Sequence, residues 1–259
     1  MATLPSSWSS VQAAPVFIIN LDRCRERMET TVERVKAAGY TDIRRHAAVD
    51  AKKENLQAAW ARHGISAKQF SPRDRDFIAM SGKQACALSW LDLLRHIAMN
   101  ATTIPFATVF EDDVLFHKDW ATLAPRYWTK TPKDFDLCYL GAQLDETLFA
   151  ACVDSVPAYC THAILLTAAG AGRIYNFIIS QQVYTIDCML RDAQIFGPEK
   201  CPFIFYTWNA KNQFPDETAV MPDEWAKRNC GLVFQDWKFG TDVCRPPDDP
   251  KLTLVDTIL

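Results

Sequence analysis

Residues 104–113 read Ile-Pro-Phe-Ala-Thr-Val-Phe-Glu-Asp-Asp, and a second apolar run, Val114 to Phe116, follows them. The first seven residues are rich in β-branched and aromatic side chains and have the length of a buried strand. The acids Glu111, Asp112 and Asp113 that end this strand are costly to bury without a positive partner. A hard divalent cation is one such partner, because Mg²⁺ and Mn²⁺ bind carboxylate and phosphate oxygens together. The alternative is a solvated acidic turn.

The chain before this stretch alternates between strand and helix patterns. Val16 to Asn20 reads as a first strand. Met28, Val32 and Val35 then recur at helical spacing, and Gly39 is a natural end for that helix. Such alternation predicts an α/β fold with a mixed, mostly parallel sheet flanked by helices. Ligands of these sheets bind at the carboxyl ends of the strands, where Asn20 and the acidic triplet fall.

Further elements are expected between these two strands. Ile43 to Val49 suggests a second strand, and the polar segment 52–75 is expected to be helical in part. Ser81 and Gln84 have the spacing of a capping box and predict the start of another helix. The apolar face of that helix consists of Ala87, Leu91, Leu94 and Ala98.

Composition indicates a globular enzyme rather than a nucleic-acid or membrane protein. Of the 259 residues, 49% are hydrophobic and 23% are charged, and the net charge of -3 argues against a basic nucleic-acid-binding face. No segment approaches the roughly 20 consecutive apolar residues of a membrane span. We expect one domain over residues 1–244 and a Pro-rich C-terminal tail over residues 245–259.

The cysteines and the N-terminus indicate a compartment. The nine cysteines contain no C-x-x-C pair, which disfavours a zinc ribbon or a thioredoxin-like site. Scattered thiols are typical of a reducing environment. The first residues lack the basic and apolar regions of a signal peptide. A cytoplasmic protein is therefore expected, and its oligomeric state is not predicted.

Six segments, taken in order, carry a resemblance to a known family. They are Val16 to Arg27, His46 to Asp50, Ser81 to Leu91, Glu111 to Asp113, Phe135 to Gly141 and Ile186 to Leu190. Their order and spacing resemble glycosyltransferase family 25, which contains lipooligosaccharide and collagen galactosyltransferases. The sequence departs from the family pattern at Trp90, where His is usual, and at Ala85, where a second Gly is frequent.

The resemblance implies a single-domain GT-A (Rossmann-like) fold and a hexosyltransferase. The expected donor is a UDP-sugar, with galactose or glucose favoured, and the expected acceptor is a glycan or a protein-linked acceptor, such as a glycoprotein. The expected reaction is inverting and depends on Mn²⁺ or Mg²⁺. A catalytically inactive relative that binds nucleotide sugars or glycans is the alternative, which the departure at Trp90 leaves open. Neither a P-loop nor a kinase motif supports a phosphotransferase.

The family resemblance assigns the donor to the segment after the first strand. Asn20, Leu21, Arg23 and Arg27 are expected to meet the nucleoside and its phosphates, together with Asp50. Arginine suits a diphosphate because its fork binds two oxygens at once. The alternative is an ordinary charged start of a helix.

Lys83 is a further candidate for the donor phosphates. A lysine in the first turn of a helix is locally unfavourable, and a bound anion satisfies both the lysine and the free backbone amides. The alternative is a lysine whose side chain extends into solvent.

The acidic triplet resembles an Asp-x-Asp type metal motif. In such motifs the last acid generally reaches the cation, so Asp113 is the expected metal ligand and Glu111 and Asp112 are expected to contact the donor. Mg²⁺ and Mn²⁺ prefer six oxygens, so further ligands are needed. A late segment resembles a family motif and makes Glu217 or Asp216 a second metal candidate, with an ordinary acidic loop as the alternative.

Asp187 is the candidate catalytic base. The family's Ile-Asp-x-x-Leu segment, here beginning at Ile186, places an acid near donor sugar and acceptor. An inverting transfer needs a base that removes the proton of the attacking hydroxyl. The alternative is a structural role, because Thr185 is able to cap a helix whose first turn favours an acid.

Overall fold

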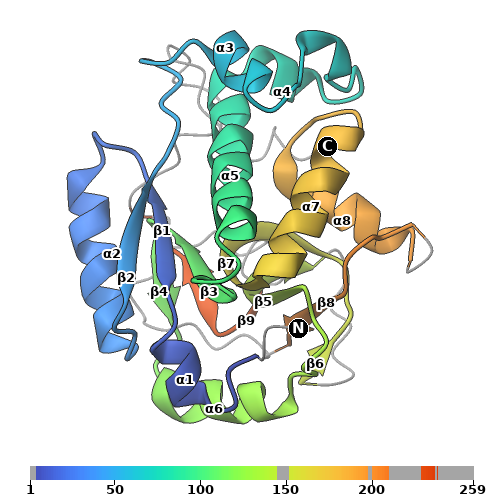
Figure 1. The fold of residues 1–259 in the computed structure, drawn as a ribbon. Helices are drawn as coiled ribbons and strands as arrows, with labels where there is room; N and C mark the ends of the chain where they lie inside the picture. Colours follow the sequence, from blue (N-terminus) through green and yellow to red (C-terminus); the bar gives the residue numbers. More distant parts are fainter. Residues whose placement is uncertain (1–3, 145–151, 198–199, 210–228, 237, 239–259) are drawn as a thin grey trace.

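The computed structural model describes residues 4–144, 152–197, 200–209, 229–236 and 238 (Figure 1). Its main sheet has eight strands in the order β2-β1-β3-β7-β5-β8-β6, with β9 paired to β5. Their bounds are β1 Val16–Asn20, β2 Ile43–Ala47, β3 Phe106–Glu111, β5 Leu137–Leu144, β6 Val153–Asp154, β7 Ala158–Thr167, β8 Phe205–Trp208 and β9 Asn229–Gly231. A two-stranded sheet pairs β4 (Val114–Phe116) with β10 (Val233–Gln235).

The predicted α/β architecture with a mixed, mostly parallel sheet is confirmed. Within the described part of the chain, β1, β2, β3, β5 and β8 point one way, whereas β6, β7 and β9 run against them. The helices are α1 Trp8–Gln12, α2 Arg25–Ala37, α3 Leu56–Ala61, α4 Arg75–Ala79, α5 Ser81–Met99, α6 Trp120–Lys130, α7 Ala168–Ser180 and α8 Ile186–Ile195, with a 3-10 turn, η1, at Ala67–Gln69. We find no helix among these with the length and apolarity that a membrane crossing requires.

Alternating side chains of the central strands fill two cores on opposite faces of the sheet. Phe17 and Ile19 of β1 pack with α5, α7 and α8, which lie together over one face in Figure 1. Val16 and Ile18 pack on the other face with α1, α2 and α6. This follows from the two-residue period of a strand. The division into residues 1–244 and a tail remains a prediction, because residues 239–259 lie outside the described part.

The early elements agree closely with the sequence pattern. The first strand has the predicted bounds, and the second ends at Ala47, two residues before the predicted end at Val49. Gly39 follows the last residues of α2 with a φ of +95°, which favours glycine over any residue with a side chain. The helix predicted from Ser81 spans Ser81–Met99 and buries Ala87, Leu91 and Leu94.

The start of α5 differs from the predicted capping box. Met80 precedes the helix and provides no capping oxygen, and Ser81 is already helical. Gln84 turns back instead, and its amide donates to the backbone oxygens of Phe77 and Ile78 at 3.1 and 3.2 Å. The capping prediction was wrong because the Ser-x-x-Gln pattern lies one residue inside the helix.

Gly141 is required where β5 meets the last strands. A Cβ at this position would lie 1.9 Å from the backbone oxygen of Val233 and 2.7 Å from His162 Nε2. We expect Gly141→Ala to destabilise the fold by about 1–3 kcal/mol, as overpacked sites do. Gly172→Ala in α7 is the matched control, since its Cβ would meet only Ala98 Cβ at 3.6 Å. Urea denaturation of both variants measures this, and equal free energies of unfolding would contradict the prediction.

Candidate active site

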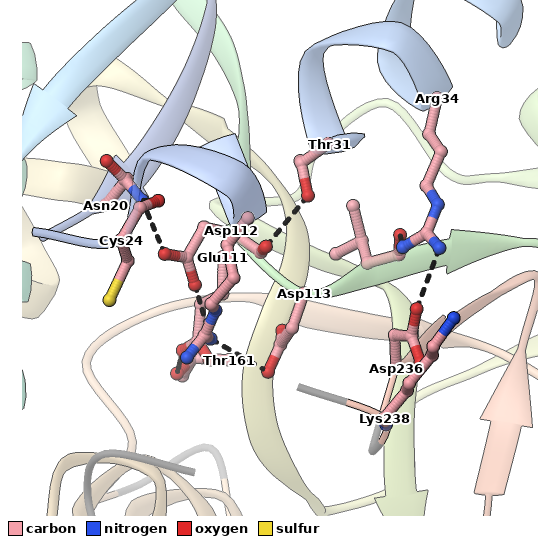
Figure 2. Close-up of polar contacts among 12 residues, drawn as sticks. Asn20, Cys24, Thr31, Arg34, Glu111, Asp112, Asp113, Thr161, Asp236 and Lys238 are labelled. Atoms are coloured by element: carbon pink, nitrogen blue, oxygen red, sulfur yellow. Dashed lines mark hydrogen bonds and ion pairs between the residues drawn. The ribbon is translucent and has the colours of Figure 1, made fainter. Parts of the chain in front are cut away.

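The acidic triplet lies where two parallel strands end side by side. β1 and β3 are neighbours, and their register pairs Ile19 with Glu111. Asn20 and Asp112 therefore leave the same edge of the sheet, and Asn20 Nδ2 donates to Asp112 Oδ2 at 2.6 Å. Figure 2 shows Asn20 and Thr31 reaching Asp112 from two sides. Asn20 and the acids therefore lie at the carboxyl ends of β1 and β3, as the sequence predicted.

Helix α2 holds the triplet from above the sheet. Thr31 Oγ1 donates to the backbone oxygen of Asp112 at 2.8 Å. Arg27, one turn earlier on the same face, places Nη2 2.5 Å from Asp112 Oδ1 and 3.4 Å from Asp113 Oδ2. In this structure, then, Arg27 faces the acids that were predicted to share the donor site with it.

Glu111 is half-buried, and its side chain contacts residues of α5 and β7. Its Oε1 accepts hydrogen bonds from Thr161 Oγ1 at 3.1 Å and from Trp90 Nε1 at 3.4 Å. Burial raises the pKa of Glu111, the nearby charges of Asp112 and Asp187 raise it further, and the two hydrogen bonds oppose the shift. Trp90, which departs from the family pattern, thus supplies an N–H donor to the first acid of the triplet.

Asp113 is the least compensated of the three acids. Burial, followed by the charge of Glu111, raises the pKa of Asp113 to about 8, with Arg27 opposing and Asp112 adding to the shift. Its Oδ1 is buried and has no hydrogen-bond partner among the described residues. A buried carboxylate oxygen without a donor is unfavourable, so a cation or a proton is expected there.

Asp187 lies at the start of α8, close to the triplet. Its carboxylate accepts from the backbone N–H groups of Cys188 at 2.8 Å and of Cys160 at 3.4 Å. Burial raises the pKa of Asp187, and these hydrogen bonds and the charge of Lys83 oppose the shift. Thr185 precedes the helix without capping it, and its hydroxyl donates to Asp74 Oδ2 instead. The predicted base therefore stands beside Glu111, on an element from the second half of the chain.

Lys83 does not extend into solvent. Only 11% of its side chain is exposed, and Nζ lies 3.6 Å from Asp76 Oδ2. The charge of Lys83 acts to lower the pKa of both Asp187 and Asp74, against the effect of burial. The role of Lys83 toward a donor phosphate remains a prediction.

A basic cleft opens beside Asn20. It has a volume of about 630 Å³ and is lined by Asn20, Asp22, Arg23, Arg25, Met28, Glu29, Arg45 and Lys53. Arg45 fixes the mouth of the cleft, because it donates to Asn20 Oδ1 at 2.9 Å and to Asp22 Oδ1 at 2.6 Å. Four cationic and two acidic side chains give this cleft an excess of positive charge, which suits phosphate oxygens.

The remaining donor candidates surround this cleft. Arg23 Nε lies 3.4 Å from Asp50 Oδ2, so these two residues form an ion pair. The half-buried Leu21 contributes its backbone oxygen, which accepts from Cys24 N at 2.9 Å and forms the turn before α2. Asn20 and Arg23 thus line the cleft and Asp50 adjoins it through Arg23, and the binding roles of these residues remain predictions.

The residues described fit a divalent cation through one protein ligand. No group of three His, Cys, Asp or Glu side chains that would hold a metal occurs in the described ranges. Glu217 and Asp216, the predicted later ligands, lie outside those ranges. Within the triplet, Asp113 Oδ1 is the buried oxygen that has no hydrogen-bond partner in the described residues. A cation that takes its other oxygens from a diphosphate and water fits such a site.

Strand β7 departs from regular pairing where it passes these acids. Gly141 pairs with Ala163 and Gln143 with Tyr159, so two steps along β5 correspond to four along β7. Cys160, within this bulge, has a φ of +67°, a region that strongly favours glycine. Bulges of this kind redirect side chains near active sites. The sequence analysis did not predict this bulge, because Cys160 fits an apolar strand pattern.

The bulge brings together two acids from different parts of the chain. Cys160 offers its backbone N–H to Asp187, while the next residue, Thr161, offers its hydroxyl to Glu111. Thr161 and Trp90 are therefore site residues, because both donate a hydrogen bond to Glu111. The sequence analysis did not predict either contact.

We expect substitutions at Cys160 to separate by backbone preference. Cys160→Val places a β-branched residue at a left-handed φ and should destabilise the protein by about 1–3 kcal/mol. Cys160→Gly accepts this φ and should change the free energy of unfolding by less than about 1 kcal/mol. Urea denaturation of both variants gives the comparison. Equal losses in the two would argue that the side chain, rather than the backbone, is what matters.

Comparisons with known proteins place the chain among glycosyltransferases. The model of glycosyltransferase family 25, described as an LPS biosynthesis protein, matches residues 13–153, over half of the chain. No curated protein is significantly similar in sequence.

Two solved structures are distantly similar. A glycosyltransferase involved in glycosylation of the major capsid of PBCV-1 is 9% identical, with 65% of each chain covered and a TM-score of 0.35. Mouse xyloside xylosyltransferase 1 in its apo form is also 9% identical, with 77% of this chain and 76% of that chain covered and a TM-score of 0.41. These scores are too low to support an argument, so the family assignment rests on the sequence match.

Proposed function

Because the chain belongs to glycosyltransferase family 25, we propose that it transfers a hexose, galactose or glucose, from a UDP-sugar to a hydroxyl of a glycan or protein-linked acceptor. The observation that supports this proposal is a chain of contacts between a basic cleft and the acids: Asn20, which lines the cleft, donates to Asp112, the neighbour of Glu111. The adjacent residues Thr161 and Cys160 in turn donate to Glu111 and Asp187. Carboxylates able to activate a hydroxyl thus adjoin cations suited to a diphosphate.

The basic cleft is proposed to hold the nucleotide. Arg23 and Asn20 line it at the carboxyl end of β1, and α2 begins at Arg25 with its free amides at the same place. A helix start adds positive potential for a diphosphate. Asp50, which forms an ion pair with Arg23, is proposed to meet the nucleoside, and Lys83 is proposed to meet phosphate oxygens.

A divalent cation, Mn²⁺ or Mg²⁺, is proposed to join the donor to the triplet. Asp113 would hold it through Oδ1, with Glu217 as the later ligand that remains a prediction. When bound, such a cation supplies positive charge to the departing diphosphate. Asp112 is engaged by Asn20 and Arg27 and is proposed to orient the donor side of the site.

Asp187 is proposed to act as the base of an inverting transfer. Its carboxylate takes the proton of the acceptor hydroxyl while that oxygen bonds to the anomeric carbon and the bond from this carbon to the UDP oxygen breaks. The backbone N–H groups of Cys160 and Cys188 orient the carboxylate. Burial raises the pKa of Asp187, which makes the ionised carboxylate a stronger base. Glu111, fixed by Trp90 and Thr161, is proposed to contact the donor sugar or ribose.

The proposed donor site predicts that UDP binding depends on a divalent cation. UDP should raise the melting temperature more in Mn²⁺ than in a chelator, because a diphosphate beside carboxylates is repelled without a cation. Uridine, which lacks phosphate, serves as the control and should show little dependence on Mn²⁺. Thermal denaturation measures all four conditions. Equal stabilisation by UDP with and without the chelator would remove the cation from the proposal.

The proposed base predicts that loss of the Asp187 carboxylate abolishes most of the transfer activity. Asp187→Asn keeps the size of the side chain but cannot accept a proton, so the transfer rate should fall by about 10²–10⁴-fold. UDP affinity should stay near that of the wild type. Asp42→Asn, an exposed aspartate before β2 that pairs with Arg44, is the control.

The result of this experiment separates three cases. A normal transfer rate in Asp187→Asn would eliminate Asp187 as the base. A joint loss of stability and UDP binding would assign it a structural role. UDP binding by the wild type without transfer to any acceptor, and without hydrolysis of any UDP-sugar, would favour the inactive binding module.

A further inference from the structure

We infer that Arg27 is the resident counter-cation of the acidic triplet and competes with a divalent cation for Asp113. The inference rests on the proposed function in taking Asp113 as the metal ligand. It adds a distinct role for Arg27, which the sequence analysis assigned to the donor phosphates.

The contacts of Arg27 place its charge where a metal charge is expected. Its Nη2 atom lies 2.5 Å from Asp112 Oδ1 and 3.4 Å from Asp113 Oδ2, so one nitrogen bridges two carboxylates. The exposed fraction of the side chain is 15% for Arg27, 9% for Asp112 and 12% for Asp113. At such burial, water screens the charges little.

The two halves of this bridge differ in strength. The contact to Asp112 is short, and Asn20 supports it from the other carboxylate oxygen of Asp112. The contact to Asp113 is almost an ångström longer, and the other oxygen of Asp113 has no hydrogen-bond partner in the described residues. Asp113 is therefore the acid that is able to exchange Arg27 for another cation.

The position of Arg27 on α2 keeps its guanidinium close to Asp113. Thr31 lies one turn further along the same helix face and binds the backbone oxygen of Asp112. The helix is thus fixed against the triplet, and the guanidinium stays within reach of Asp113. A divalent cation entering alone meets a positive charge a few ångströms away, which weakens its binding.

A nucleotide changes this balance. A diphosphate brings negative charge to both the cation and Arg27, so it offsets their mutual repulsion. We therefore expect the wild-type chain to bind Mn²⁺ weakly by itself and much more tightly together with UDP. Arg27 should oppose metal binding and favour nucleotide binding, and these opposite signs distinguish its role from that of a structural clamp.

The test measures Mn²⁺ binding without nucleotide. Electron paramagnetic resonance of free Mn²⁺ at low ionic strength gives the affinity of the wild type and of Arg27→Gln. Loss of the competing charge should raise the Mn²⁺ affinity of Arg27→Gln roughly tenfold or more. Arg27→Lys keeps the charge and should remain as weak as the wild type. UDP affinity in saturating Mn²⁺ should fall in Arg27→Gln.

Arg44→Ala is the control. Arg44 also pairs with an aspartate, Asp42 at 2.7 Å, but this pair is exposed, and neither residue contacts the triplet or lines the cleft in the described structure. Its Mn²⁺ affinity should stay within about twofold of the wild type. Circular dichroism and urea denaturation identify variants that fail to fold, in which case Arg27→Met, a neutral chain of similar length, replaces Arg27→Gln.

The outcomes are separable from those of the proposed function. An unchanged or lower Mn²⁺ affinity in folded Arg27→Gln, or an equal gain in Arg44→Ala, overturns the competition. Absence of UDP binding by the wild type, with or without Mn²⁺, overturns the proposed donor. The Mn²⁺ comparison between wild type and Arg27→Gln retains its meaning in that case, because it involves no nucleotide.

Discussion

The placement of three adjacent carboxyl groups, one half-buried and two buried, at the end of β3 is the constraint on which the rest of the site depends. Each acid needs a compensating group: Glu111 receives hydrogen bonds from α5 and β7, Asp112 is contacted from β1 and α2, and Asp113 is contacted from α2. The order β1-β3-β7 in the sheet is what makes these elements neighbours of the triplet. The acids therefore link the early strands, the helix α2 and the later strand β7 into one network.

Elements of the fold were predictable where local chemistry decides them. The β-branched and aromatic runs before Asn20 and Glu111 became central strands because no other structure buries them so completely. Gly39 was predictable because a left-handed residue after a helix excludes most side chains. The general place of the acids followed from the rule that parallel strands present their carboxyl ends on one edge.

Other features depend on contacts that no local pattern contains. The capping box at Ser81 failed because Gln84 finds its partners in the preceding segment, Phe77 and Ile78. The bulge at Cys160 lies in the pairing of β7 with β5, and a cysteine in an apolar strand pattern gives no sign of it. The attachment of Arg27 to Asp112 and Asp113 joins residues more than eighty positions apart in the sequence. For Glu217, the sequence remains the only source of the assignment.

The insertion of antiparallel β7 between β3 and β5 has an evolutionary consequence. The family match ends at residue 153, so the triplet belongs to the matched part, whereas Thr161 and Asp187 belong to the remainder. Yet Glu111 of the first part depends on a hydroxyl from the second. Divergence in the second part is therefore constrained by the first, and substitutions at Thr161 and Glu111 should be epistatic, with their effects on stability and binding failing to add.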